Sequence, residues 1–154
     1  MVVTGAEIRK ELNDLNKKVE AAWKRHEATP GHENRPFVCP GVGVVGNCTY
    51  TSVYLASRLG GDVYGYQIKD NSKAIVGSGE FGHDFVLIGG KFLVDFWAKD
   101  TYEYRDLYDL SKLKDAQEVL KMYGSMKFWT KMSPEDFKRW EGNLSSYEYP
   151  LRRR

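Results

Sequence analysis

The order of local patterns in this sequence predicts an α+β fold, with N-terminal helices packed on a small antiparallel sheet and further helices after it. Two helical patterns come first, over residues 4–28 and 48–59. Three short, largely apolar segments follow, and the pair Gly89-Gly90 between the second and third is typical of a hairpin. Because helices and strands occur in separate blocks rather than alternating, the class is α+β.

The first half of the chain carries clear helix signals. Thr4 and Glu7 form a capping-box pattern ahead of apolar residues at helical spacing. These apolar residues are Ile8, Leu12, Leu15, Val19 and Trp23. Prolines and glycines predict a loop over 29–47, and Gly60-Gly61 ends the second helix.

The second half is predicted to hold the sheet. We expect strands over 62–68, 81–88 and 91–97, with the last two in the middle of the sheet because both of their faces are largely apolar. The remaining predictions are a polar, flexible connector over 70–79, an exposed Tyr- and Asp-rich stretch over 99–109, a helix over 111–123, and a short helix that Ser133 caps.

Length and charge limit the function classes. The 154 residues fit one domain over 1–150 with a basic tail over 151–154. The chain holds 23 Lys and Arg against 21 Asp and Glu, and Arg152–154 account for three of the basic residues. The remaining balance of 20 to 21 predicts no basic face for nucleic acid.

The sequence also argues against a membrane protein and against a metal or cofactor site. No apolar run approaches the roughly 18 residues of a membrane helix, and the first five residues do not resemble a signal peptide. We therefore expect a cytoplasmic setting, although a delivered effector would also lack such a signal. Cys39 and Cys48 have no zinc-site spacing, and no strand precedes the glycine string at 41–46, so neither zinc nor a dinucleotide is predicted.

Cys48 is the first candidate for chemistry, because Gly46-Asn47-Cys48 opens a helix. Unpaired backbone N–H groups and the positive end of the helix favour a thiolate there. The same N–H groups can serve as an oxyanion hole in acyl transfer. The alternative is that Cys48 is a small apolar residue in a buried helix.

His83 and Asp95 are the second and third candidates. Each lies in an otherwise apolar strand segment and needs a polar partner. A two-residue loop would place Asp84 opposite Asp95, which like charges disfavour. A three-residue loop, Ile88-Gly89-Gly90, instead pairs Leu87 with Lys91 and brings His83 opposite Asp95. The alternatives are a core histidine bonded to backbone, and an Asp95 paired with Lys91 or Arg58.

These segments together resemble the Cys-His-Asp order of the papain-like and transglutaminase-like superfamily. The resemblance covers about residues 44–97 and is greatest to small papain-fold domains of bacterial toxins and effectors. It implies one papain-like catalytic domain, with Cys48 as nucleophile, His83 as base and Asp95 as the orienting acid. No Gln precedes the Cys as it does in many papain-type peptidases, and the Arg-Gly-Gly motif of arylamine acetyltransferases is absent. Asn47 or the Cys48 N–H would then bind the oxyanion. Gln67 is a candidate to line the cleft, and the alternative is that it lies on a solvated strand face.

Two functions follow from these observations. The first is a cysteine-dependent amide-bond hydrolase or acyltransferase that forms a thioester with a protein or peptide substrate. Proteolysis, glutamine deamidation and transglutamination share this chemistry, so the class includes thiol proteases, deamidases and toxin enzymes. The second is a binding or structural module that keeps the papain-like fold without catalysis.

Overall fold

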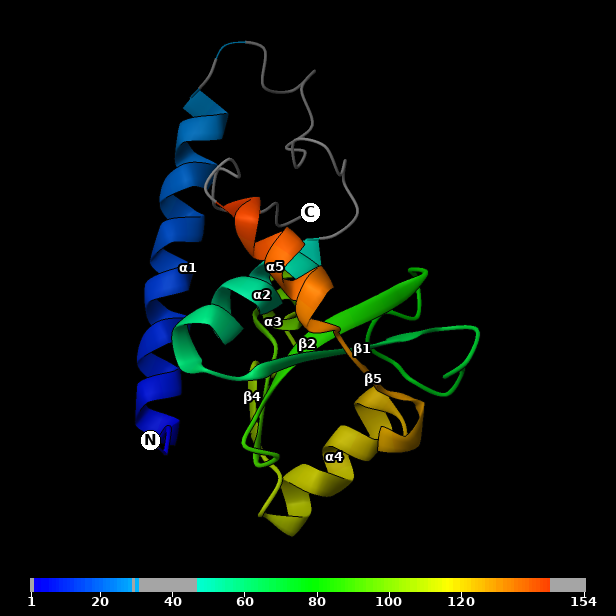
Figure 1. Ribbon diagram of the computed structural model, residues 1–154. Coiled ribbons are helices and arrows are strands. Elements are labelled where there is room, and N and C mark those ends of the chain that lie inside the picture. Colours follow the sequence, from blue (N-terminus) through cyan, green and yellow to red (C-terminus); the bar gives the residue numbers. More distant parts are fainter. Residues whose placement is uncertain (1, 29, 31–46, 145–154) are drawn as a thin grey trace.

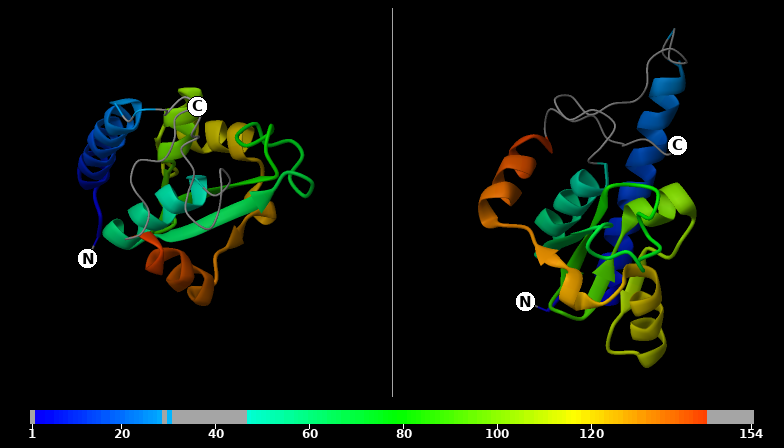
Figure 2. Two further views of the ribbon diagram at one scale, coloured as in Figure 1. Left: turned by 90° about the horizontal axis from the view of Figure 1, so that it is seen from above. Right: turned by 90° about the vertical axis from the view of Figure 1, so that its right-hand side faces the viewer.

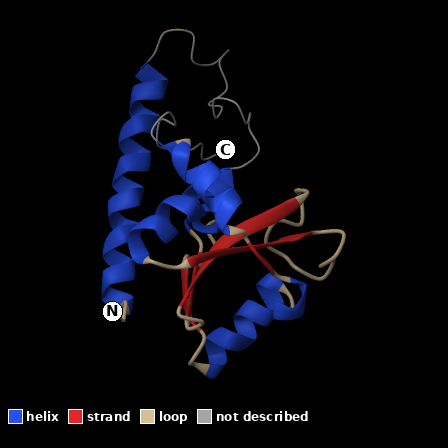
Figure 3. Ribbon diagram, in the orientation of Figure 1, coloured by secondary structure: helices blue, strands red, loops and turns tan. Residues whose placement is uncertain are grey.

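A five-stranded antiparallel sheet lies between two groups of helices, which confirms the α+β class (Figures 1 and 3). The computed structural model describes residues 2–28, 30 and 47–144. The predicted loop over 29–47 lies outside the described residues, apart from residues 30 and 47. Cys39 and the basic tail over 151–154 also lie outside them. The elements are α1 (Gly5–Ala28), α2 (Asn47–Leu59), β1 (Asp62–Gln67), β2 (Gly82–Ile88), β3 (Phe92–Val94), α3 (Phe96–Tyr102), β4 (Leu107–Asp109), α4 (Leu113–Tyr123), β5 (Thr130–Lys131) and α5 (Pro134–Gly142), with a 3-10 turn at Met126–Phe128.

The sheet has the order β4-β3-β2-β1-β5, so the predicted hairpin is central. One face packs against α1, α2 and α5, and the other packs against α4, which lies on the opposite side of the sheet from α2 (Figures 1 and 2). Because successive strand residues point to opposite faces, β2 sends Val86 and Ile88 toward α2, and His83 and Phe85 toward α4.

The long helix α1 begins as the sequence predicts. The backbone N–H of Thr4 donates to Glu7 Oε2 at 2.8 Å, and the Glu7 N–H donates to Thr4 Oγ1 at 3.2 Å, which is a complete capping box. The predicted core positions of this helix are buried: Ile8, Leu12, Leu15 and Val19. The side chain of Trp23 lies outside the described part. The Ser133 cap of α5 is also confirmed, since its hydroxyl accepts from Asp136 N.

The β2–β3 hairpin has a three-residue loop, as expected, but the predicted register is wrong by two residues. The loop is Gly89-Gly90-Lys91, and Ile88 pairs with Phe92. Both glycines have positive φ angles, 57° and 66°, so they complete the turn with Lys91 and leave the buried Ile88 in the strand. A shift of two residues preserves which side chains share a face. His83 and Asp95 therefore still meet, although they are diagonal rather than directly opposite.

The predicted strand over 91–97 is wrong beyond Val94. Asp95 accepts a hydrogen bond from the Ala98 N–H at 3.0 Å and is the N-cap of α3. The stretch predicted to be exposed over 99–109 is partly buried, because Tyr108 in β4 is 1 % exposed. The apolar residues that follow Val94 can be buried either in a strand or in a short helix. The hydrogen bond that caps the helix at Asp95 favours the helix.

The connector between β1 and β2 is not the polar, flexible segment that we expected. Asn71, Ala74 and Val76 are buried. The backbone N–H groups of Ile75 and Val76 both donate to Met122 O, at 2.9 Å each. The connector is therefore packed against the C-terminal end of α4.

Candidate active site

Cys48 lies in the first turn of α2, where the sequence places it. Its side chain is half-buried and is a free thiol. Helix α2 packs along the central strand β2, and the side chain of Thr49 reaches Asp84 of that strand. Consequently the N-terminal end of α2 lies beside the start of β2, which carries His83.

His83 and Asp95 form a buried pair. The Nε2 atom of His83 lies 2.5 Å from Oδ2 of Asp95, and the two residues are 2 % and 1 % exposed. A carboxylate this deeply buried is costly unless it is paired and hydrogen-bonded. The pairing supports the predicted relation between the two residues and shows that His83 is not a core histidine bonded to backbone.

The Asp95 carboxylate has two further donors. Tyr123 donates its hydroxyl to Asp95 Oδ2 at 2.8 Å, and the Ala98 N–H donates to Oδ1. The alternative partners considered for Asp95 are wrong. Arg58 instead forms an ion pair with Glu11 at 2.6 Å, and the Lys91 ammonium lies over a phenylalanine ring, 5.0 Å from its centroid.

Tyr123 is a site residue that sequence reasoning missed. It is fully buried at the end of α4, 28 positions along the chain from Asp95. Burial raises the pKa of its hydroxyl, and the nearby Asp95 charge raises it further, so Tyr123 stays a proton donor. No local motif marks it; its place at the C-terminal end of a predicted helix is the one available signal.

Aromatic rings surround the imidazole of His83. The ring centroid of Trp97 lies 5.0 Å from that of His83, and the Tyr66, Phe85 and Tyr123 rings lie at 6.2, 6.2 and 6.1 Å. Such a surround excludes water, and charges interact more strongly there than in solvent. The His83–Asp95 pair is therefore electrostatically strong.

The protonation of His83 reflects its neighbours. Burial disfavours the imidazolium, but the charge and hydrogen bond of Asp95, followed by the nearby Cys48 thiol, raise the pKa of His83 to about 10. The second ring nitrogen, Nδ1, is buried and has no hydrogen-bond partner within the described residues, so no hydrogen bond joins it to Cys48 in this structure. Asp95 thus occupies one nitrogen of the ring, and the other is unbonded with the Cys48 thiol nearby.

Two further predicted site residues are less defined. Asn47 is the first residue of α2, and its side chain lies outside the described part. Gln67 is exposed at the end of β1, opposite Gly82. Their roles in binding the oxyanion and the substrate remain predictions.

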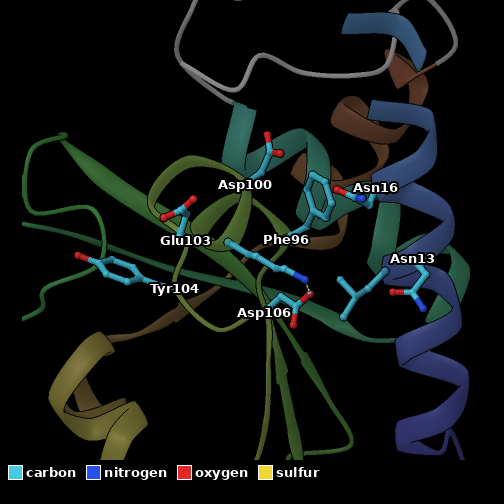
Figure 4. A pocket seen from close by; sticks show the side chains of 9 residues that line it. Asn13, Asn16, Phe96, Asp100, Glu103, Tyr104 and Asp106 are labelled. Carbon is cyan, nitrogen blue, oxygen red and sulfur yellow. Dashed lines mark ion pairs between the residues drawn. The ribbon is translucent and has the colours of Figure 1, made fainter. Parts of the chain in front are cut away.

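A cavity of about 420 Å³ lies between α1 and the segment that contains α3 (Figure 4). Asn13 and Asn16 come from α1, and Asp100, Glu103 and Tyr104 come from the opposite side. Cys48, His83 and Asp95 do not line it. The cavity shares with the candidate site only the helix that Asp95 caps.

Comparisons with protein-family models, with curated proteins and with solved structures found no significant match. Within the described residues, no helix has the length and apolar character needed to cross a membrane. In the same part of the chain, no group of three or more His, Cys, Asp and Glu side chains is arranged to hold a metal ion.

Proposed function

We propose that this chain is a cysteine-dependent amide-bond hydrolase or acyltransferase of the papain-like or transglutaminase-like type. Cys48 is the nucleophile, His83 is the general base and acid, and Asp95 orients the imidazole. The observation that carries the proposal is the buried His83–Asp95 pair at 2.5 Å, with the other ring nitrogen unbonded and the Cys48 thiol nearby.

The proposed reaction begins from an imidazolium–thiolate pair, in which the Cys48 proton already resides on His83 Nδ1. The thiolate attacks the amide carbonyl and forms a tetrahedral intermediate, which the N–H groups at the start of α2 can stabilise. Collapse of the intermediate breaks the C–N bond, and the imidazolium gives its proton to the leaving amine. Water, activated by His83, then attacks the thioester, releases the acid and restores the thiol.

The nature of the amine decides the outcome of this reaction. A peptide nitrogen as leaving group gives proteolysis, and ammonia from a glutamine side chain gives deamidation. An incoming amine in place of water gives transglutamination. The expected substrate is therefore a protein or a peptide, with no cofactor in any step.

Thiol reactivity tests the proposal without a known substrate. We expect brief iodoacetamide treatment at about pH 6 to alkylate Cys48 well ahead of Cys39, because only a thiolate reacts quickly at that pH. Mass spectrometry of the digested protein measures both sites in one sample. The His83→Ala variant should lose the preference, since the base is gone.

Equal and slow labelling of the two cysteines in the wild-type protein would contradict the proposal. That outcome would favour the second function, a module that keeps the fold without catalysis. A Cys39→Ala variant serves as the control, because its Cys48 labelling should match that of the wild type.

A further inference from the structure

A second contact joins the two segments that carry the proposed nucleophile and base. Thr49 follows Cys48 in α2, and Asp84 follows His83 in β2. The Thr49 hydroxyl donates to Asp84 Oδ2 at 2.5 Å, and Thr49 is 6 % exposed. The mechanism proposed above uses neither residue.

The position of Asp84 follows from strand geometry. Neighbouring residues of a strand point to opposite faces, so His83 turns toward Tyr123 and Trp97, and Asp84 turns toward α2. One short segment of β2 thus holds the proposed base on one face and a hydrogen bond to the helix of the proposed nucleophile on the other.

Gly65 makes room for this carboxylate. It is the cross-strand partner of Asp84 in β1, and a Cβ at Gly65 would overlap the Asp84 Oδ1 atom and press on His83 O. The φ angle of Gly65 is not positive, so conformational freedom does not explain the glycine. A close approach by a neighbouring group is the usual reason for glycine inside a strand.

The charge state of Asp84 is compatible with this position. Burial raises the pKa of its carboxyl, while the hydrogen bond from Thr49 and the charge of His83 lower it in part. The hydrogen bond from Thr49 thus favours the carboxylate form of Asp84 and holds it toward α2.

We propose that Thr49 and Asp84 are positioning residues, whose hydrogen bond fixes the start of α2 against the start of β2 and thereby sets the separation of the Cys48 thiol and the His83 imidazole. This inference rests on the proposed function. It adds a specific requirement, namely that the reactivity of Cys48 depends on a bond on the far face of the strand.

The test measures the rate of Cys48 alkylation by iodoacetamide between about pH 5 and pH 9. Thr49→Val keeps the volume and removes the hydroxyl, so the rate at about pH 6 should fall about tenfold, the size expected for one hydrogen bond. Thr49→Ser restores the hydroxyl and should recover most of the rate. A loss of stability alone would leave the pH dependence of alkylation unchanged, so the pH profile separates a positioning role from a structural one.

Thr101→Val is the matched control. Its hydroxyl is buried in α3 and has no hydrogen-bond partner among the described residues. The same exchange of a hydroxyl for a methyl group should therefore leave Cys48 alkylation unchanged.

The double variant Thr49→Val/Asp84→Leu keeps the test decisive if Thr49→Val does not fold. Replacing both partners of a buried hydrogen bond by apolar groups of similar shape can be nearly neutral for stability. We expect this variant to fold and to alkylate as slowly as Thr49→Val. Wild-type rates in the folded double variant would overturn the inference, and so would a failure of Thr49→Ser to recover.

The two proposals can fail separately. If wild-type Cys48 reacts no faster than Cys39, the proposed function fails. If wild-type Cys48 is reactive and the double variant is equally reactive, the catalytic assignment stands and only the role of Thr49 and Asp84 is lost.

Discussion

The carboxylate of Asp95 has two tasks, because it caps α3 and pairs with His83. Oδ1 accepts from the Ala98 N–H, and Oδ2 accepts from Tyr123 and lies against His83. The helix cap therefore holds the carboxylate in the position from which it orients the imidazole. The cap of α3 needs only an acceptor oxygen, whereas the pair with His83 depends on the carboxylate charge. A mutation that removes only the charge can therefore separate the two tasks.

Asp95→Asn should reduce the reactivity of Cys48 much more than it reduces stability. The amide oxygen can still cap α3, but the charge that stabilises the His83 imidazolium is lost. We expect the iodoacetamide rate at about pH 6 to fall about a hundredfold, toward that of an ordinary thiol. Urea unfolding of the same variant measures the change in stability.

Asp106→Asn is the control for this substitution. Asp106 is also buried, and it pairs with Arg9 at 2.9 Å and with Lys99 at 3.4 Å. It should lose stability while keeping the reactivity of Cys48. An unchanged alkylation rate in Asp95→Asn, together with a large loss of stability, would make Asp95 a structural residue.

The sequence predicts the three proposed site residues but not the groups that hold them. Cys48 is identified by a helix start, and His83 and Asp95 by polar groups in apolar surroundings. Tyr123 and the Thr49–Asp84 bond depend on contacts between elements far apart in the chain, 28 and 35 positions respectively. Such contacts are set by packing, which no local pattern encodes.

At the scale of elements, α4 brings Tyr123 to the site, and Arg105 docks the helix through ion pairs with Asp115 and Glu118. Arg105 contacts Asp115 through two bonds of 2.9 and 3.2 Å, and the Asp109 N–H donates to the same carboxylate. The hydrogen bond from Arg105 is the largest cause that lowers the pKa of Asp115. This contact ties the N-terminal end of α4 to β4.

Asp115→Ala should destabilise the fold by about 1 kcal/mol, because it leaves the Asp109 N–H without its acceptor and leaves Arg105 with Glu118 as its ion-pair partner in α4. Arg105 is half-exposed, so solvent screening limits the share of the ion pair itself. Urea unfolding at neutral pH measures the loss. Because the pKa of Asp115 is lowered, this stability is present at neutral pH and disappears as pH falls through the folded pKa.

Asp136→Ala gives a comparison at an exposed ion pair. Asp136 contacts Arg139 within α5, and both side chains are largely exposed. We expect a change of no more than about 0.5 kcal/mol. A loss at Asp115 no larger than the loss at Asp136 would mean that this contact does not dock α4.

Helices and strands were predictable where the spacing of apolar residues and the residues that begin or end an element agree. The helix α1 has both a capping box and an apolar stripe, and the structure has it with nearly the same bounds. The segment after Val94 lacks such agreement, since Phe96 and Ala98 are buried in α3 and would also be buried in a strand. The hairpin was predictable only in part. Its glycines indicate a turn, but the register depends on Ile88 being buried in the strand rather than placed in the loop.

Over the whole molecule, the His83–Asp95 pair links folding to pH. Its surroundings raise the pKa of His83 to about 10 in the folded state, against about 6.5 for an unperturbed histidine. A raised pKa means that the pair contributes its full stability below about pH 6.5 and loses it as pH rises toward the folded value. Buried tyrosines add to the loss only above about pH 10, where free tyrosine ionises.

The cleanest measurement of this linkage uses the Cys48→Ala variant. In the wild type, a proton that passes from the thiol to His83 leaves the total number of bound protons unchanged and hides the effect. Without the thiol, Asp95 still holds the imidazolium, so the free energy of unfolding should fall by up to about 1.4 kcal/mol per pH unit above about pH 7. Urea unfolding between about pH 6 and pH 9.5 gives the slope, and Cys48→Ala/His83→Gln should lack most of it. Equal slopes in the two variants would mean that His83 is neutral in the folded protein, and the proposed imidazolium would have to be abandoned.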